Sequence, residues 1–465
     1  MLLGLLLAAV VGAAPTAQTG ISLPLRAPRA PLGDDADAFA VARGEHRRAL
    51  AKYGYGRQKR DIDLKGWGYG YTVSVQVGTP PQTFDVMPDT GSYDFWLIGA
   101  CDNTTECGDA KVYRTATSSS FQTTDMEFQA GPYVDGGVQR GMWGSDQVRV
   151  GQQAVYASVG VSNETLNWRL AMDGIMGFAP GATSIHTLPW WFLAVAEWTD
   201  KQFGMHLGRV PPNIGANKAG AAGYGDLTLG GVNHALFTGE IVYYPLLKGP
   251  QSTHWEISMR VVVGGKSVGS DLPALIDSGT TLVIGPAAYV EAFYEALPTL
   301  VLSVGGGQYV YKAAPLGAGL NFGGETYLFD DDDLCHLRGS KAWFAANGVD
   351  LPEDGDWCLG GVTGQGSLSN SGNVDTGDPA MLDFDFWIVG ITFMKNVYTA
   401  FRAEPPAVGF AQLSPESNKK YAVSSAAATP TGRVPVATVS VVSGAGKIMP
   451  SVAVLVLGAA LVLAL

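Results

Sequence analysis

The sequence predicts an all-β protein, mainly strands with short helices, and three observations support that prediction. The 465 residues include 61 glycines, and few stretches have the apolar spacing of an amphipathic helix. Apolar and polar residues alternate with a period of two over 71–77, as in a half-buried strand. The Gly-Thr-Pro-Pro-Gln turn at 78–82 then leads into an apolar segment at 83–87, which we expect to be a partner strand.

Charge is unevenly distributed along the chain. The net charge is −12 at pH 7, but residues 1–60 carry +5 and residues 416–465 carry +3, so residues 61–415 carry −20. Such an acidic body repels itself at neutral pH and is relieved when its carboxylates take up protons. The charge therefore argues against a nucleic-acid partner and indicates an acidic working environment. Hydrophobic residues make up 46% of the chain, so a large core is expected.

The first 60 residues have the features of segments that are removed from a secreted protein. Residues 1–14 form an apolar run that ends in small residues, which is more typical of a secretory signal than of a core strand. We assign residues 1–19 to a signal peptide. Residues 20–60 are rich in Arg, Ala and Pro and end in the dibasic pair Lys59-Arg60, which predicts a propeptide. The alternative is an ordinary charged linker.

The C-terminal end predicts attachment to a membrane. Residues 416–447 are rich in Ser, Thr, Ala, Val and Pro and read as a stalk. Residues 448–465 are apolar apart from one serine, no polar residue follows them, and small residues precede them. This pattern indicates a GPI-attachment signal. The alternative is a single spanning helix, for which the run is short and lacks a basic cytoplasmic anchor.

Four cysteines are expected to be oxidised in a secreted protein, and they allow three pairings. Proximity in sequence favours Cys101 with Cys107 and Cys335 with Cys358. A zinc site is disfavoured because no C-x-x-C pair exists and the chain has 6 histidines, so we expect neither a metal nor a cofactor. Two N-x-T sequons, at Asn103 and Asn163, are compatible with glycosylation in the secretory pathway.

A weak internal repeat marks the candidate catalytic residues. Asp89-Thr90-Gly91-Ser92 has a counterpart in Asp277-Ser278-Gly279-Thr280, and both follow an apolar segment. Two apolar residues and a glycine follow each motif, at 175–177 and at 388–390. One such triplet has no weight, but two with the same surroundings form a specific signal.

Two neighbouring carboxyls are suited to peptide-bond hydrolysis. Like charges at close range cannot ionise together, so one pKa is raised and the other lowered. The ionised group of Asp89 and Asp277 then acts as general base towards a water molecule, and the protonated group acts as general acid. The alternative is that the two motifs are Asx turns with a purely structural role.

Over nearly all of 61–415 the chain resembles the pepsin family of aspartic proteases. The matching landmarks are GTPPQ at 78–82, DTGS at 89–92, Trp96, the loop between Cys101 and Cys107, MDGIMGF at 172–178, DSGTT at 277–281, the pair Cys335 and Cys358, and WIVGITFMKNVYTAF at 387–401. The resemblance implies a bilobal fold with an active-site cleft between an N-terminal lobe, 61–240, and a C-terminal lobe, 241–415. It also implies protein or peptide substrates, and we expect a monomer.

The same resemblance implies roles for the residues around the dyad. Ser92 and Thr280 would bond the outer oxygens of the two carboxyls, and Thr90 and Ser278 would lock the two loops together. Tyr133 corresponds to the tyrosine of a mobile flap, which Trp96 would support. The chain departs from the family at Pro88, Gly137 and Ile391, where an apolar residue with a free N–H, a serine and an aspartate are more usual.

Two further expectations concern the precursor and the substrate. Lys52-Tyr53 resembles the pair with which family propeptides block the dyad, although a generic basic linker is an equal alternative. Asp135 lies two residues beyond Tyr133, at a position that is aspartate in many fungal members. The GPI-type tail resembles that of the yapsin-like fungal branch. Asp135 is therefore expected either to pair with a basic substrate residue or only to cap the hairpin turn.

Two rival interpretations remain. A G-x-S-x-G motif at 265–269 is typical of serine hydrolases, but it requires a strand–turn–helix elbow, whereas this segment reads as the tip of a hairpin. The second rival is a catalytically inactive relative that serves as a binding or cell-wall protein. Such relatives usually lose an Asp or the following Gly, and both triplets are intact here.

Overall fold

The computed structural model describes residues 20–26, 52, 70–100, 110–130, 138–166, 172–181, 188–209, 222–364 and 385–419. The predicted signal peptide, the hydrophobic tail and most of the propeptide and stalk lie outside these ranges. Among the described residues no helix is both long and apolar enough to span a bilayer.

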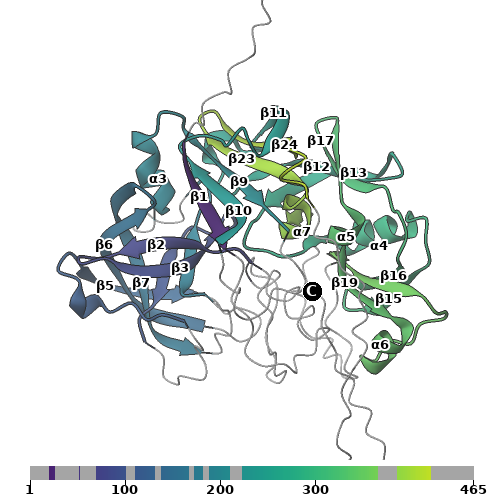
Figure 1. Cartoon of the computed structure of the whole chain (residues 1–465), viewed down its shortest axis with the longest axis horizontal. Helices are drawn as coiled ribbons and strands as arrows, with labels where there is room; N and C mark the ends of the chain where they lie inside the picture. The colour runs from purple at the N-terminus through teal and green to yellow at the C-terminus, as the bar shows by residue number, and fades with distance from the viewer. Residues whose placement is uncertain are drawn as a thin grey trace, which may run out of the picture.

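The fold is mostly β, as predicted, and one seven-stranded sheet forms the body of the N-terminal part of the chain (Figure 1). The predicted hairpin at 71–87 is present in it as its first two strands, which pair antiparallel. In spatial order the strands are β2 (Val73–Val77), β3 (Gln82–Asp89), β8 (Gly174–Gly177), β4 (Phe95–Ile98), β7 (Gln153–Leu166), β6 (Val138–Val150) and β5 (Gln122–Ala130).

A second seven-stranded sheet and a four-stranded sheet form the C-terminal part, on the other side in Figure 1. The larger sheet has the order β18 (Glu325–Leu328), β17 (Ala318–Phe322), β12 (Glu256–Val263), β13 (Lys266–Ile276), β22 (Trp387–Val389), β14 (Val283–Gly285) and β21 (Val362–Gly364). The smaller one has the order β15 (Val301–Gly305), β16 (Gln308–Lys312), β20 (Asp356–Gly360) and β19 (Cys335–Ser340).

The internal repeat of the sequence is a repeat of strand topology. In the first sheet β8 runs parallel to β3 and antiparallel to β4, and β4 runs parallel to β7. In the second sheet β22 stands in the same relation to β13 and β14, and β14 runs parallel to β21. Each half of the chain therefore builds the same arrangement around its own Asp-Thr/Ser-Gly motif.

A six-stranded sheet joins the two halves (Figure 1). Its order is β1 (Ile21–Arg26), β10 (Ala222–Leu229), β9 (Gln202–Leu207), β23 (Val397–Ala403), β24 (Pro406–Leu413) and β11 (Phe237–Pro245). Strand β11 runs across the predicted lobe boundary at residue 240. Strand β1 lies in the segment predicted to be a propeptide, and the sequence analysis did not foresee it. Pro24 is exposed in this edge strand, where a missing backbone N–H costs little.

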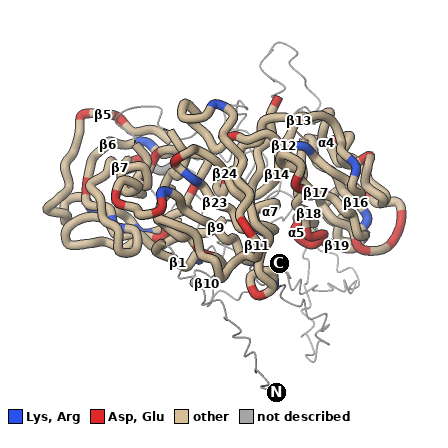
Figure 2. Tube along the Cα trace, turned by 90° about the horizontal axis from the view of Figure 1, so that it is seen from above, with Lys and Arg blue, Asp and Glu red and all other residues tan. Residues whose placement is uncertain are grey.

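The helices are short and lie around the sheets. Those with described bounds are α3 (Trp190–Ala194), α4 (Ala287–Glu295), α5 (Asp331–Leu334), α6 (Lys341–Ala346) and α7 (Ile391–Met394), with 3-10 turns at Thr115–Thr117, Val195–Glu197 and Gly249–Gln251. Helix α5 is the red segment beside its label, right of the centre in Figure 2. Within it, Asp333 pairs with Arg209 at 2.6 Å, so part of this charge is neutralised from the end of β9.

An aromatic cluster packs the two halves against each other. The ring centroid of Trp255 lies 5.8 Å from that of Trp191 of α3 and 5.1 Å from that of Phe401 of β23. Phe401 in turn stacks on Phe203 of β9, with 4.9 Å between ring centroids. The indole N–H of buried Trp255 also donates to the carbonyl of Phe178 at 2.8 Å. Large buried rings contribute most of the apolar area of such a core, so this cluster gives the site a rigid base.

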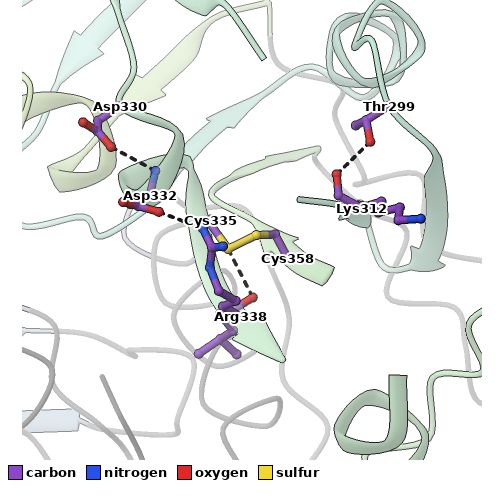
Figure 3. The surroundings of a disulfide bond; sticks show 8 residues. Thr299, Lys312, Asp330, Asp332, Cys335, Arg338 and Cys358 are labelled. Carbon is purple, nitrogen blue, oxygen red and sulfur yellow. Dashed lines mark hydrogen bonds and ion pairs between the residues drawn. A yellow bond between two sulfur atoms is a disulfide. The ribbon is translucent and has the colours of Figure 1, made fainter. Parts of the chain in front are cut away.

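A disulfide joins Cys335 of β19 to Cys358 of β20, the second of the two predicted pairings (Figure 3). It staples neighbouring strands of the four-stranded sheet. The other predicted pair, Cys101 with Cys107, lies outside the described residues. The hairpin expected at 261–269 is also present, because Val263 pairs with Lys266 across its tip. Ser267 thus lies in β13, and the elbow that a serine hydrolase needs is absent there.

Candidate active site

Asp89 and Asp277 come from equivalent places in the two halves of the chain. Asp89 is the last residue of β3, and Asp277 directly follows β13. The neighbouring parallel strand holds each of them in place: the Phe178 N–H donates to the Asp89 carbonyl at 2.7 Å, and the Asp277 N–H donates to the Val389 carbonyl at 3.0 Å. Both side chains are buried, with at most 2% of the residue exposed.

Each carboxylate accepts the same two hydrogen bonds from its own loop. The Gly91 N–H donates to Asp89 Oδ1 at 3.0 Å, and Ser92 Oγ donates to Oδ2 at 2.6 Å. In the other half, the N–H of Gly279 donates to Asp277 Oδ1 at 2.9 Å and the hydroxyl of Thr280 donates to Oδ2. Buried carboxylates need such donors, because a charge without partners is costly to bury.

Thr90 and Ser278 connect the two loops directly. The Thr90 N–H donates to Ser278 Oγ at 3.0 Å, and the Ser278 N–H donates to Thr90 Oγ1 at 2.9 Å. The two hydroxyls then donate onward, Thr90 to the Ile276 carbonyl at 2.8 Å and Ser278 to the Pro88 carbonyl at 2.7 Å. All four bonds are buried, so they fix the position of one Asp loop relative to the other.

The glycine of each apolar-apolar-Gly motif permits a close approach to these loops. A Cβ added at Gly177 would lie 2.3 Å from the backbone of Tyr93, and one at Gly390 would lie 2.1 Å from the Thr280 carbonyl oxygen. Both contacts are with backbone atoms, which cannot swing aside. The apolar-apolar-Gly motif therefore recurs because a side chain at either glycine would collide with the backbone of the neighbouring loop.

Lys52 bridges the two carboxyls. Its Nζ donates to Asp89 Oδ1 at 2.6 Å and to the two carboxylate oxygens of Asp277 at 2.8 and 2.9 Å. Its side chain is only 13% exposed. The site as described is thus filled by an ammonium from the N-terminal segment, at the residue that the sequence analysis singled out as a candidate plug.

The pKa values of the three groups reflect burial and mutual charge. Burial raises the pKa of Asp89 against the effect of Lys52, and repulsion by Asp277 adds to the rise. Burial opposes ionisation of Asp277 as well, but Lys52 and hydrogen bonds from Asp89 and Thr280 outweigh it and hold the pKa of Asp277 well below its usual value. Burial disfavours the charged form of Lys52, yet the two carboxylates raise its pKa. The carboxyls therefore differ, as expected for a pair that shares one proton.

Pro88 and Ile391, which depart from the family pattern, contribute to this site through their backbone groups. Pro88 is buried in β3 opposite Met176, and its carbonyl accepts the bond from Ser278. Ile391 begins α7, and its N–H donates to the Thr280 carbonyl at 2.8 Å. Its side chain is buried and apolar. Neither departure removes a contact of the two carboxyls.

The other predicted site residues lie apart from the dyad or outside the described ranges. Trp96 is buried in β4 against Phe128, with ring centroids 6.2 Å apart. Asn163 is exposed on β7. The expected flap residues Tyr133, Asp135 and Gly137, together with Asn103 and the Cys101–Cys107 loop, lie outside the residues that the structure describes.

Sequence reasoning missed two features, one directly before the strand beside β3 and one next to the dyad. Asp173 is fully buried and accepts hydrogen bonds from the backbone N–H groups of Asp85 and Lys111, both at 2.7 Å. It stands inside the MDGIMGF segment, so a buried acidic residue within that apolar run was a usable signal. The second feature, a contact between Tyr93 and His254, had no such signal, because the two residues are 161 positions apart.

Comparison with known proteins agrees with this geometry. Residues 70–313, more than half of the chain, match the family model described as eukaryotic aspartyl protease. The chain is similar to major aspartyl peptidase 1 of Cryptococcus neoformans var. grubii, with 29% identity over 73% of this chain and 68% of that protein. It is also similar to an aspartic protease of Phaffia rhodozyma, with 27% identity over 87% and 95%. Cathepsin D of Dictyostelium discoideum is 28% identical over 73% of this chain and 82% of its own.

The bonds between Thr90 and Ser278 give a test of what joins the loops. Thr90→Val keeps the shape of the side chain but leaves the Ser278 N–H and the Ile276 carbonyl without their partner. We expect a loss of about 1–3 kcal/mol in the free energy of unfolding for each buried group left unsatisfied. Urea denaturation of the variant measures this loss. Thr90→Ser retains the hydroxyl and is the matched control. Equal stability of the valine and serine variants would contradict the assignment.

Proposed function

Because the chain belongs to the eukaryotic aspartyl protease family, we propose that it is an aspartic endopeptidase in which Asp89 and Asp277 jointly activate the attacking water. One observation carries the proposal. Two buried carboxyls, each held by an equivalent pair of donors, lie close enough for a single ammonium to bond both. Relatives that align with more than 70% of this chain are named major aspartyl peptidase 1, gastricsin and cathepsin D.

The chemistry follows from the shared proton. When the cleft holds a peptide in place of Lys52, the ionised carboxyl takes a proton from water as the oxygen attacks the peptide carbonyl. The protonated carboxyl supplies the proton that the departing amine needs. The donors at Gly91, Ser92, Gly279 and Thr280 orient the four oxygens for both transfers. The proton requirement supports operation in acid, and the acidic body at 61–415 agrees with it.

We propose further that the described state is a latent precursor. Lys52 lies before the dibasic pair Lys59-Arg60, and β1 occupies the edge of the six-stranded sheet beside β10. Removal of residues 20–60 would free the dyad. The sign of the pH dependence follows from the lowered pKa of Asp277. Docking of Lys52 is stabilised above the ordinary carboxyl pKa and is lost as the pH falls through the depressed value.

The proposal also covers the cellular location of the enzyme. A signal peptide at 1–19, a stalk at 416–447 and a GPI signal at 448–465 would place the mature enzyme at the cell surface or in the cell wall. Exposure of Asn163 leaves that sequon open to glycosylation. The resemblance supports a yapsin-like assignment and a preference for basic residues through Asp135. We expect the enzyme to act as a monomer on protein or peptide substrates.

The dyad is tested by isosteric substitution in the mature enzyme. Asp89→Asn and Asp277→Asn should each lower turnover by at least ~10²–10⁴-fold, because an amide cannot cycle a proton. The measurement is pepstatin-sensitive hydrolysis of denatured haemoglobin at acidic pH, with circular dichroism as the check on folding. The exposed Asp350→Asn is the control. Near-normal activity in either dyad variant would contradict the mechanism, and an inactive wild type would favour the binding-protein alternative.

The plug is tested in a precursor made uncleavable by Lys59→Gln and Arg60→Gln. We expect the precursor to bind pepstatin poorly at pH 7 and better as the pH is lowered. Lys52→Met should improve binding at pH 7 by tenfold or more, since no ammonium then competes for the two carboxyls. The exposed Lys266→Met is the control. Equal affinity of the Lys52→Met variant and its parent at pH 7 would show that Lys52 does not block the site.

The anchor is tested on cells that express the full chain. A phosphatidylinositol-specific phospholipase should release the mature protein, and a chain that ends at residue 447 should enter the medium. Mass spectrometry of the surface-bound protein should not find a peptide from 448–465, because attachment of the anchor removes the tail. Finding that peptide in the mature protein would support a spanning helix.

A further inference from the structure

A tyrosine from one half of the chain meets a histidine from the other beside the dyad. The hydroxyl of Tyr93 lies 2.8 Å from His254 Nε2, and the two rings meet edge to face with centroids 5.3 Å apart. The same hydroxyl lies 3.2 Å from His254 Nδ1, and this nitrogen lies 3.1 Å from the hydroxyl of Thr253. Both rings are only partly buried, so neither belongs to the core.

The backbone ties both residues of this pair to the dyad. Tyr93 directly follows Ser92, whose hydroxyl bonds Asp89 Oδ2. His254 directly precedes Trp255, whose carbonyl accepts the N–H of Ile276, the residue before Asp277. Because Trp255 is fully buried and bonds the Phe178 carbonyl, His254 stands on a rigid support. The pair therefore has a fixed place relative to the reacting atoms.

Charges on several elements face this imidazole. Burial lowers the pKa of His254, Lys52 and Lys248 lower it further, and Asp277 and Glu256 raise it. The other titratable groups at the pair are Tyr93 itself and Asp94. Burial raises the pKa of Asp94 to about 6. After burial, Lys52 has the strongest influence on the pKa of His254, and it belongs to the segment that the proposed processing removes. Its loss raises the pKa of His254, so the mature enzyme carries an imidazolium at a higher pH than the precursor does.

We propose that Tyr93 and His254 form a substrate-recognition pair that favours an acidic side chain, Asp or Glu, in the peptide segment lying beside the dyad. The inference rests on the proposed peptidase function and adds a substrate preference to it. Neutral His254 accepts the tyrosine proton at Nε2. Protonated His254 donates to the tyrosine oxygen instead, so the hydroxyl proton of Tyr93 turns to a substrate acceptor. A substrate carboxylate then meets both a cation and an O–H donor.

The preference has a defined pH window. A glutamate side chain is ionised above about pH 4.3, and an imidazole is protonated below a pKa that is ordinarily about 6.5. Burial lowers the pKa of His254 below that ordinary value. Attraction requires both charges, so the preference for Glu over the isosteric Gln is greatest between the carboxyl pKa and this lowered imidazole pKa. It declines in stronger acid because the substrate loses its charge, and it declines near neutrality because His254 loses its own.

The test uses the mature enzyme and a set of peptides with one cleavable bond. Glu and Gln are compared at each of the three positions on either side of that bond, and kcat/KM is measured from pH 3.5 to 7. At one position the wild type should prefer Glu by about tenfold near pH 5. His254→Gln should reduce this preference to within about twofold, because the Glu peptide loses more of its kcat/KM than the Gln peptide does. His234→Gln, at an exposed site, is the control.

His254→Lys provides a second, independent variant. Its ammonium does not titrate in this range, so the preference for Glu should persist to pH 7 instead of declining. Cleavage of Gln peptides without any Glu preference, or a preference that His254→Gln leaves intact, would overturn the inference while the peptidase function stands. An equal loss for Glu and Gln peptides in His254→Gln would assign the residue a structural role and overturn it too. Failure of the wild type to cleave any peptide would overturn the peptidase function as well.

Discussion

The proposed mechanism depends on one constraint, that two carboxyls from separate sheets must share one proton. A misplacement of either loop would break that sharing, because the interaction acts only at hydrogen-bond distance. The structure meets this constraint with the paired bonds between Thr90 and Ser278, which link the loops at their backbones. Their hydroxyls also reach the backbone that precedes each opposite Asp, so neither loop can shift alone. The aromatic cluster around Trp255 packs the two halves together at the same junction.

Electrostatics explains why this junction also suits latency. Buried carboxylates are costly unless compensated, and each of these two has only neutral donors from its own loop. A cation placed between them gains from both at once, which is the position that Lys52 occupies. The same ammonium lowers the pKa of His254. One side chain of the N-terminal segment thus acts on the dyad and on its neighbour, and its removal changes both.

Much of the site could be predicted because its determinants are local in sequence. Asp89 and Asp277 each carry their own turn and hydroxyl donor within three residues, and Lys52 was recognisable from its neighbour Tyr53. The glycines at 177 and 390 were visible as part of the repeat, although only the structure shows which backbone each one approaches. Strand β1 was missed because its apolar pattern is short and contains a proline, and pairing with β10 supplies what the pattern lacks. The contact of Tyr93 with His254 depends on how two distant loops meet, which no local pattern records.

The departures from the family pattern show which features of the site are free to vary. At Pro88 and Ile391 the groups that support the dyad are a carbonyl and an N–H, and these are present in either residue type. Side chains at such positions can change while the geometry of the carboxyls remains. The polarity around the Thr280 loop does change, because Ile391 places a buried apolar group there and an aspartate would place a charge. A third carboxylate there would repel the charged form of the pair and raise its pKa, and the isoleucine spares the dyad this repulsion.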